Sequence, residues 1–96
     1  MNQIRFDCDP RKAKSNTRKH GVSFEEAQSV FFDEQALLVE DPRPLHEEER
    51  FVLLGLSASV RLLVVVHALR DGDVIRIISA RKATRLEARE YEIRLR

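Results

Sequence analysis

The residues best placed to do chemistry are one histidine and three arginines that stand within or beside two apolar, β-branched runs. They are Arg61, His67, Arg76 and Arg81. Guanidinium groups bind a phosphodiester through two parallel hydrogen bonds and offset the charge that develops when the phosphorus is attacked. A neutral imidazole beside them could accept a proton. Taken one at a time, each arginine fits an ordinary solvated or ion-paired role, and the histidine fits a structural role and a functional role equally well.

The two runs are separated by Asp71-Gly72, which predicts a β-hairpin because both residues tolerate the positive φ of a two-residue type I′ turn. With that loop, His67 and Arg76 are direct cross-strand neighbours. The arginine would then disfavour the imidazolium and hold the ring neutral. This register predicts a functional face with Arg61, His67 and Arg76, and a core face with Leu62, Val64, Val66, Ala68, Ile75 and Ile77.

Other charged residues are weaker candidates. Cations near strand ends and in the first helix could contact a nucleic-acid backbone by charge, although solvated surface is the commoner role of such residues. His46 and Glu49 form a second possible cluster in a polar stretch, for which an ordinary charged loop is the favoured alternative. The candidates for nucleic-acid binding are Lys19, Arg50, Arg70 and Lys82.

Charge is unevenly distributed along the 96 residues, although the net charge is only +1. Residues 1–20 hold six Lys/Arg against two Asp/Glu, residues 21–60 hold two against nine, and residues 61–96 hold nine against five. Segregation of this kind can create a basic surface for a polyanion, so the near-neutral total does not exclude a nucleic-acid partner. Ordinary solvated faces explain the charges equally well.

Length and composition predict one folded domain over residues 1–96, because 43% of the residues are apolar and glycine and proline are few. No run is long enough to span a membrane and the N-terminus lacks the apolar centre of a signal peptide, so we expect a cytoplasmic protein. The single cysteine, Cys8, argues against a disulfide or a zinc site. Glycine loops for phosphate, His/Cys metal spacings and Gly-x-Ser-x-Gly elbows are absent from the sequence, so we expect neither a cofactor nor a metal.

Local signals predict an α+β fold with an antiparallel meander, because no helix separates the later strands. Asp9-Pro10 is typical of a helix start and Gly21 of a helix end. Capping boxes at Ser23–Glu26 and Thr84–Glu87 open two further helices. The predicted elements are a strand around Ile4 and Phe6, helices from Pro10 to His20 and from Ser23 to Phe32, strands over Ala36–Glu40 and Phe51–Ser57, the hairpin, and a helix from Thr84 to Leu95 whose Leu86, Tyr91 and Leu95 cover one side.

Several separated motifs together give the chain a specific pattern. They are Lys19-His20-Gly21-Val22-Ser23-Phe24-Glu25-Glu26-Ala27, then His46-x-x-Glu49-Arg50, Arg61-Leu-Leu-Val-Val-Val-His67, Ile75-Arg76-Ile77-Ile78-Ser79-Ala80-Arg81-Lys82-Ala83, and Glu90-Tyr91. This pattern closely resembles the BrnT toxins of bacterial type II toxin–antitoxin systems over nearly the whole chain. The chain departs from the family at Cys8, where Trp is usual, Thr17, where an apolar residue is common, Val60, where Gly often precedes the arginine, and Ala68, where Thr often follows the histidine.

The resemblance implies a RelE/ParE-like fold and a metal-independent endoribonuclease that cleaves mRNA and arrests translation. The implied partners are the RNA substrate and a ribbon-helix-helix antitoxin of the BrnA kind, encoded alongside, whose complex with the toxin binds its own operator DNA. The alternative is a non-catalytic RelE-like module that binds a protein or RNA, since members of one fold need not share an activity. Incubation of purified RNA with the protein in EDTA distinguishes these two functions.

Overall fold

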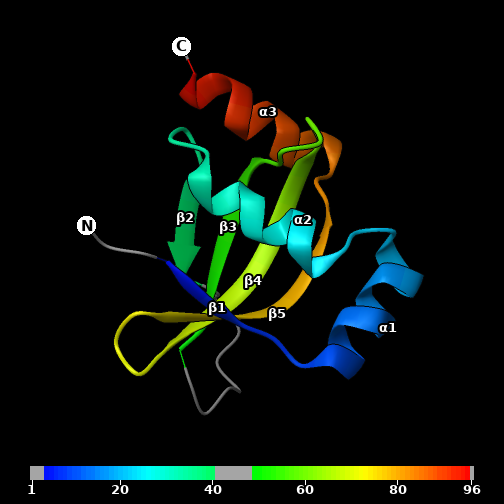
Figure 1. Ribbon diagram of the computed structural model, residues 1–96. Coiled ribbons are helices and arrows are strands. Elements are labelled where there is room, and N and C mark those ends of the chain that lie inside the picture. The colour runs from blue at the N-terminus through cyan, green and yellow to red at the C-terminus, as the bar shows by residue number, and fades with distance from the viewer. Residues whose placement is uncertain (1–3, 41–48, 96) are drawn as a thin grey trace.

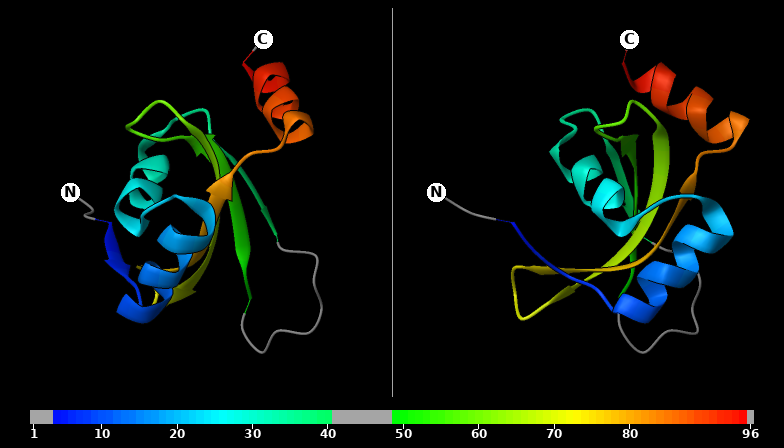
Figure 2. Two further views of the ribbon diagram at one scale, coloured as in Figure 1. Left: turned by 90° about the vertical axis from the view of Figure 1, so that its right-hand side faces the viewer. Right: turned by 45° about the vertical axis from the view of Figure 1, so that its right-hand side comes forward.

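The computed structural model of the protein describes residues 4–40 and 49–95. It shows a twisted five-stranded sheet with α1 and α2 on one face and α3 on the other (Figures 1 and 2). None of the helices in this described part is long and apolar enough to cross a membrane. The elements are β1 (Arg5–Asp7), α1 (Pro10–His20), α2 (Phe24–Ser29), the 3-10 turn η1 (Val30–Phe32), β2 (Leu37–Glu40), β3 (Phe51–Leu56), β4 (Leu62–Arg70), β5 (Val74–Lys82) and α3 (Arg85–Arg94).

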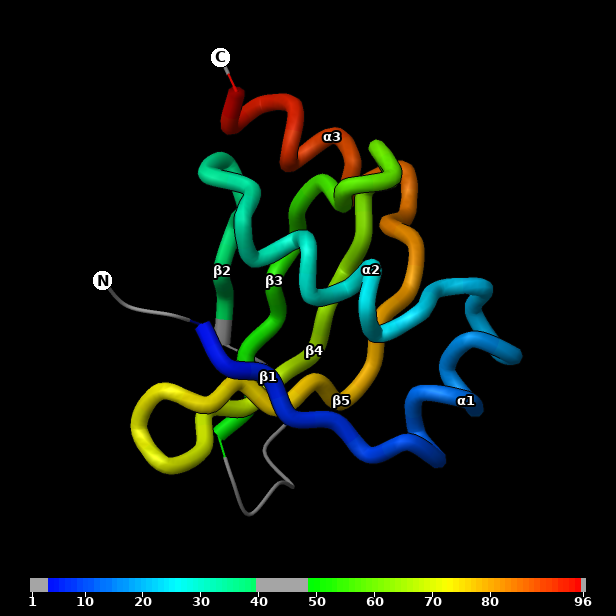
Figure 3. The backbone as a smooth tube through the Cα atoms, viewed as in Figure 1, coloured from blue at the N-terminus to red at the C-terminus, as the bar shows by residue number. Residues whose placement is uncertain are grey.

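The sheet has the order β1-β5-β4-β3-β2. Strands β2 to β5 form the antiparallel meander that the sequence predicts, and the α+β class is confirmed. Strand β1 pairs in parallel with the start of β5, so two segments about 70 residues apart in sequence lie side by side near the β4–β5 hairpin (Figure 3). The two edges of the sheet are therefore β1 and β2.

The predicted register of the hairpin is wrong. The loop has three residues, Asp71 to Asp73, so Arg70 pairs with Val74 and His67 faces Ile77 instead of Arg76. A β-bulge beside Val66 and His67 shifts the pairing by one more residue toward the end of β5. A one-residue slip reverses the faces of a strand. Arg76 consequently lies on the sheet face opposite to His67.

The sheet is buried on both faces. The larger core lies under α1 and α2, and its buried members are Val22, Phe24, Ala27, Val30, Leu53, Leu63, Val65, Ile77 and Ala80. Neighbouring residues in the same strands point to the other side, where Leu54 and Val64 pack with Tyr91 of α3. Ile77, Leu63 and Val65 therefore all belong to the core under α1 and α2. The predicted core face included Ile77 but neither Leu63 nor Val65.

Helix α1 begins and ends where its sequence signals predict. The carboxylate of Asp9 accepts a hydrogen bond from the amide of Arg11, and Gly21 adopts the left-handed conformation at the other end, with φ of +68°. In α2 the capping box is half formed: Ser23 Oγ accepts from the amide of Glu26, but the Glu26 carboxylate turns toward β4 instead. In α3 the box of Thr84 and Glu87 is complete.

Helix α3 covers less of the sheet than its sequence suggests. Tyr91 is buried, but Leu86 and Leu95 are exposed, so the prediction that these three cover one side is wrong. The Tyr91 hydroxyl donates a hydrogen bond of 2.6 Å to Asp33, and burial together with this carboxylate raises the pKa of Tyr91 to about 12. This contact ties α3 to the turn that precedes β2.

Val60 precedes β4 in the left-handed region, with φ of +60°, and its side chain is 76% exposed. A β-branched residue is strained there, whereas glycine is not. We expect Val60→Gly to raise the free energy of unfolding by about 1 kcal/mol. Relief of such backbone strain is worth about 1–3 kcal/mol, and the greater conformational entropy of glycine in the unfolded chain offsets part of it. Urea unfolding measures the effect. Val60→Ala, which keeps a Cβ at the same φ, should gain less, and equal gains for both variants would contradict the backbone explanation.

Candidate functional site

Arg81 lies at the end of β5 on the face that α3 covers. Its guanidinium donates two hydrogen bonds, at 2.8 and 2.9 Å, to the two carboxylate oxygens of Glu87 in the first turn of α3. The hydrogen bonds from Arg81, together with the amide of Thr84, outweigh burial and lower the pKa of Glu87 to about 2. This bidentate arrangement is the one by which an arginine would bind a phosphate.

Arg61, just before β4, lies on the opposite face and binds α2. Its Nε donates to Glu26 at 2.9 Å, a terminal nitrogen makes a second bond to the same carboxylate, and a further bond of 3.1 Å reaches the carbonyl of Gly21. Ser57 also donates to Glu26, at 2.7 Å. The hydrogen bonds from Arg61 and then Ser57 lower the pKa of Glu26 although burial opposes them. Arg61 thus joins the start of β4 to both α-helices of that face.

Arg76 is far from Arg61 and Arg81. It donates to Asp7 of β1 at 2.9 Å, and its neighbour across the strands is Ala68. Five residues separate Arg76 from Arg81 along β5, which corresponds to roughly 15 Å. One phosphate cannot contact both side chains at that distance. Arg76 therefore acts here as the partner that fixes β1 to the sheet.

His67 is 4% exposed and lies under the helices. Its ring makes an edge contact with Phe31, with centroids 4.7 Å apart, and its Nδ1 lies 3.3 Å from the carbonyl of Val65. Because a carbonyl can only accept, Nδ1 carries the proton. Burial lowers the pKa of His67, and the hydrogen bond to Val65 opposes this shift. Burial therefore favours the neutral ring, a role that the predicted register assigned to Arg76.

A buried neutral histidine makes stability depend on pH. In the unfolded chain His67 takes up a proton near pH 6.5, whereas in the folded protein its pKa is lower. The contribution of the neutral histidine to the free energy of unfolding is therefore complete above about pH 6.5, and it is lost as pH falls toward the lower folded pKa. We expect the unfolding free energy to decrease below pH 6.5 with a slope of up to about 1.4 kcal/mol per pH unit from His67 alone.

The measurement is chemical unfolding at pH 7.5, 6.5 and 5.5 for the wild type and for His67→Gln. Other groups titrate alike in both proteins, so the difference between the two curves isolates the histidine. Equal slopes would show that His67 keeps its ordinary pKa in the folded state.

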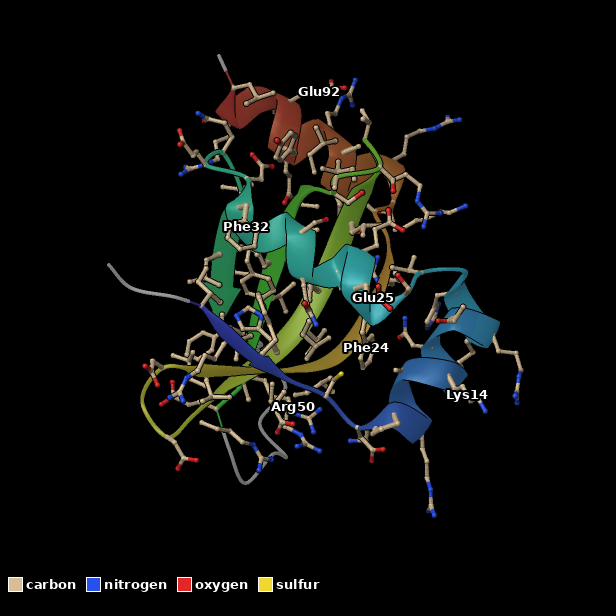
Figure 4. All side chains as sticks on the ribbon, viewed as in Figure 1. Lys14, Phe24, Glu25, Phe32, Arg50 and Glu92 are labelled. Atoms are coloured by element: carbon tan, nitrogen blue, oxygen red, sulfur yellow. The ribbon has the colours of Figure 1, made fainter. Side chains whose placement is uncertain are left out.

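The remaining predicted residues lie at both ends of the sheet. Lys82 is exposed at the end of β5 and close enough to Glu26 to lower its pKa, and Lys19 stands in the last turn of α1 beside the carbonyl that binds Arg61. Arg50 and Glu49 precede β3 at the end of the sheet away from α3 (Figure 4), and Arg70 ends β4 near the hairpin loop. The predicted residue His46 lies outside the described residues.

One group of predicted residues does come together, and we call it the basic end: Arg61, Arg81 and Lys82 at the junction of β4 and β5, with Lys19 nearby. Leu63 pairs with Lys82 and Val64 with Arg81, so the cations border one end of the ladder on its two faces. His67 and Arg76 are not part of it. The sequence analysis missed the acidic partners Glu26 and Glu87, which it interpreted as capping residues alone.

A metal site is not evident in the described part of the chain. Within residues 4–40 and 49–95, no three His, Cys, Asp or Glu side chains lie together in a way that could hold a metal ion. The basic end itself offers guanidinium and ammonium groups, which bind anions.

Comparison with known proteins relates the chain to one family model and to a solved structure. A family model described as the ribonuclease toxin BrnT of type II toxin–antitoxin systems matches residues 8–87. A crystal structure of the Brucella abortus ribonuclease toxin BrnT superposes with a TM-score of 0.65 at 19% identity, covering 86% of this chain and all of that one, which supports the fold. No curated protein sequence matches the chain. The family match confirms the resemblance seen in the motifs: the chain belongs to the BrnT ribonuclease toxins of type II toxin–antitoxin systems.

Proposed function

We propose that this protein is a metal-independent endoribonuclease that cleaves mRNA and so arrests translation, and that an antitoxin of the BrnA kind neutralises it. The family match supports a ribonuclease toxin and an antitoxin partner. The observation that carries the site is the bidentate pair of Arg81 with Glu87 at the basic end. Glu87 occupies the place on Arg81 that the phosphate of an RNA would take.

In the proposed reaction, the ribose 2′-oxygen attacks the adjacent phosphorus. A bond forms between the 2′-oxygen and phosphorus, the bond from phosphorus to the 5′-oxygen breaks, and the products end in a cyclic phosphate and a 5′-hydroxyl. One proton leaves the 2′-oxygen and one is taken up by the 5′-oxygen. Arg81 offsets the growing negative charge. Lys82 lies on the opposite face, toward Glu26, and only adds positive charge at the same end of the sheet.

His67 does not serve as the base in this proposal. It lies under α1 and α2, whereas Arg81 is on the face under α3, so the sheet separates the two side chains. Arg61 supports the site from the other face by fixing the start of β4 to Glu26. The non-catalytic alternative keeps the same basic end but uses it only to bind RNA or a protein.

The test is incubation of the purified protein with a defined single-stranded RNA in excess EDTA. Cleavage should continue with the metal chelated, and the products should carry cyclic phosphate ends. Protein purified in parallel as Arg81→Ala controls for contaminating nucleases. Cleavage that requires added magnesium would exclude the metal-independent mechanism, and absence of cleavage with and without magnesium would favour the binding module.

A further inference from the structure

An apolar pocket of about 310 Å³ lies on the α2 side of the sheet, away from the basic end. Phe31, Phe51 and His67 form part of its wall. Its rim includes Leu38 of β2 and Leu69 of β4, which are 61% and 54% exposed although both are leucines. Large apolar side chains left in water around a concave apolar site are typical of a surface that binds something.

The same rim belongs to an open edge of the sheet. Strand β2 is the last strand in the sheet order, and no described strand pairs with its outer side. The exposed Val39 follows Leu38 on the other face of this strand. An unpaired edge presents backbone donors and acceptors that fit an extended chain, about 4.8 Å away. Every second side chain of such a chain would lie on the same face as Leu38, and the one next to Leu38 would lie over the pocket.

We infer that β2 is the docking edge for an extended segment of the antitoxin, which adds a sixth strand and inserts one large apolar side chain into the pocket. This inference rests on the proposed function, because it requires the antitoxin partner. Strand addition supplies affinity through the backbone, and the pocket supplies selectivity for a side chain. The antitoxin would then bind at a surface that is separate from the basic end.

The lining of the pocket argues against RNA as its occupant. Asp33 is an ionisable group in the wall besides His67. Its oxygens already accept hydrogen bonds from Tyr91 and from the amides of Leu56 and Gln35, and its charge would repel a phosphate. No arginine or lysine is among the residues described as lining the pocket. A base would therefore find little to hydrogen-bond, whereas an apolar side chain fits.

The length of β2 argues against a second copy of this chain. The strand has four residues, so pairing between two β2 edges would bury far less than the roughly 1,200–2,000 Å² of a stable interface. An antitoxin segment can continue past the strand and contact more of the surface. A partner chain that extends beyond the edge is thus the better match to its size.

The test compares Leu38→Asp with the control Leu86→Asp, which changes another exposed leucine, 72% exposed on α3. The probe is the purified antitoxin protein from the reading frame next to the toxin gene, with affinity measured by titration calorimetry. We expect Leu38→Asp to weaken binding at least 30-fold and to leave RNA cleavage within about twofold of wild type. Leu86→Asp should bind within about threefold of wild type.

Two further measurements guard against a folding defect. Leu69→Asp changes the same rim from β4 and should weaken binding as Leu38→Asp does. Hydrogen exchange on the wild-type protein should show that the β2 amides gain protection in the complex. Circular dichroism establishes that each variant is folded before its affinity is compared.

The possible failures can be told apart. If the wild type forms no complex with the antitoxin, the proposed antitoxin partner is rejected, and the inference that β2 is its docking edge is rejected as well. If the complex forms but both rim variants bind normally and β2 gains no protection, the docking edge alone is overturned. A loss of RNA binding with normal antitoxin binding would assign the pocket to RNA, and a wild-type dimer lost in Leu38→Asp would assign the edge to a second copy.

Discussion

Replacing Asn16 by alanine should lower the free energy of unfolding by about 3–5 kcal/mol. Asn16 is 6% exposed, and its side-chain amide hydrogen-bonds helix α1 to strand β5 of the sheet. Its Nδ2 donates to the carbonyls of Val22 and Ala80 at 2.9 and 2.8 Å, and its Oδ1 accepts from the amide of Ala80 at 3.1 Å. The alanine variant would remove the Asn16 partner of the carbonyl and the amide of Ala80, at about 1–3 kcal/mol each, and would leave the carbonyl of Val22 with only the longer hydrogen bond from Thr17.

Urea denaturation followed by circular dichroism measures this effect. The matched control is Ser15→Ala, which changes the adjacent exposed residue of the same helix and should cost less than about 0.5 kcal/mol. A loss below about 1 kcal/mol in Asn16→Ala would show that water replaces the missing amide. Asn16→Asp should also be destabilising, because a carboxylate cannot donate to the two carbonyls.

Helix ends and strand order could be predicted because their signals are local. Asp9-Pro10 and Gly21 fix α1, and Thr84 with Glu87 fixes the start of α3. The meander follows from successive apolar runs joined by short connections. The α2 segment differs slightly, since its last turn changes to a 3-10 turn over Val30–Phe32.

The hairpin register could not be predicted because it depends on packing. Ile77 and Ala80 both belong to the core under α1 and α2, although they are three positions apart in the sequence. In a regular strand they would point to opposite faces. The bulge between them restores the inward direction of Ala80, whose backbone then meets Asn16. A helix residue 64 positions away thus contacts the strand segment next to the bulge, and the sequence around the hairpin carries no sign of this contact.

The candidate site was only partly predictable for a related reason. The arginines stand out in the sequence, but their charge partners come from distant segments: Glu26 for Arg61 and Asp7 for Arg76. Glu87 is near Arg81 in sequence, yet its capping role hid its second role as an ion-pair partner. The three residues expected on one face therefore lie apart: Arg61 belongs to the basic end, Arg76 binds Asp7 of β1, and His67 is buried.

Arg81→Ala should reduce RNA cleavage about 100-fold or more while the protein stays folded. Removing one preorganised donor to a developing oxyanion typically costs 10²–10³ in rate. The ion pair with Glu87 is partly exposed, so its loss should change stability by less than about 1 kcal/mol. Initial rates on a defined RNA, and relief of growth arrest at equal protein level, measure the effect.

The decisive control is Glu87→Gln, because it breaks the same ion pair but keeps Arg81. Glu87, with its pKa near 2, is ionised at neutral pH and competes with a phosphate for the guanidinium. The neutral amide should therefore leave cleavage at or above the wild-type rate. If Glu87→Gln loses as much activity as Arg81→Ala, the ion pair matters only for structure. If Arg81→Ala stays fully active, phosphate binding must be sought away from the basic end.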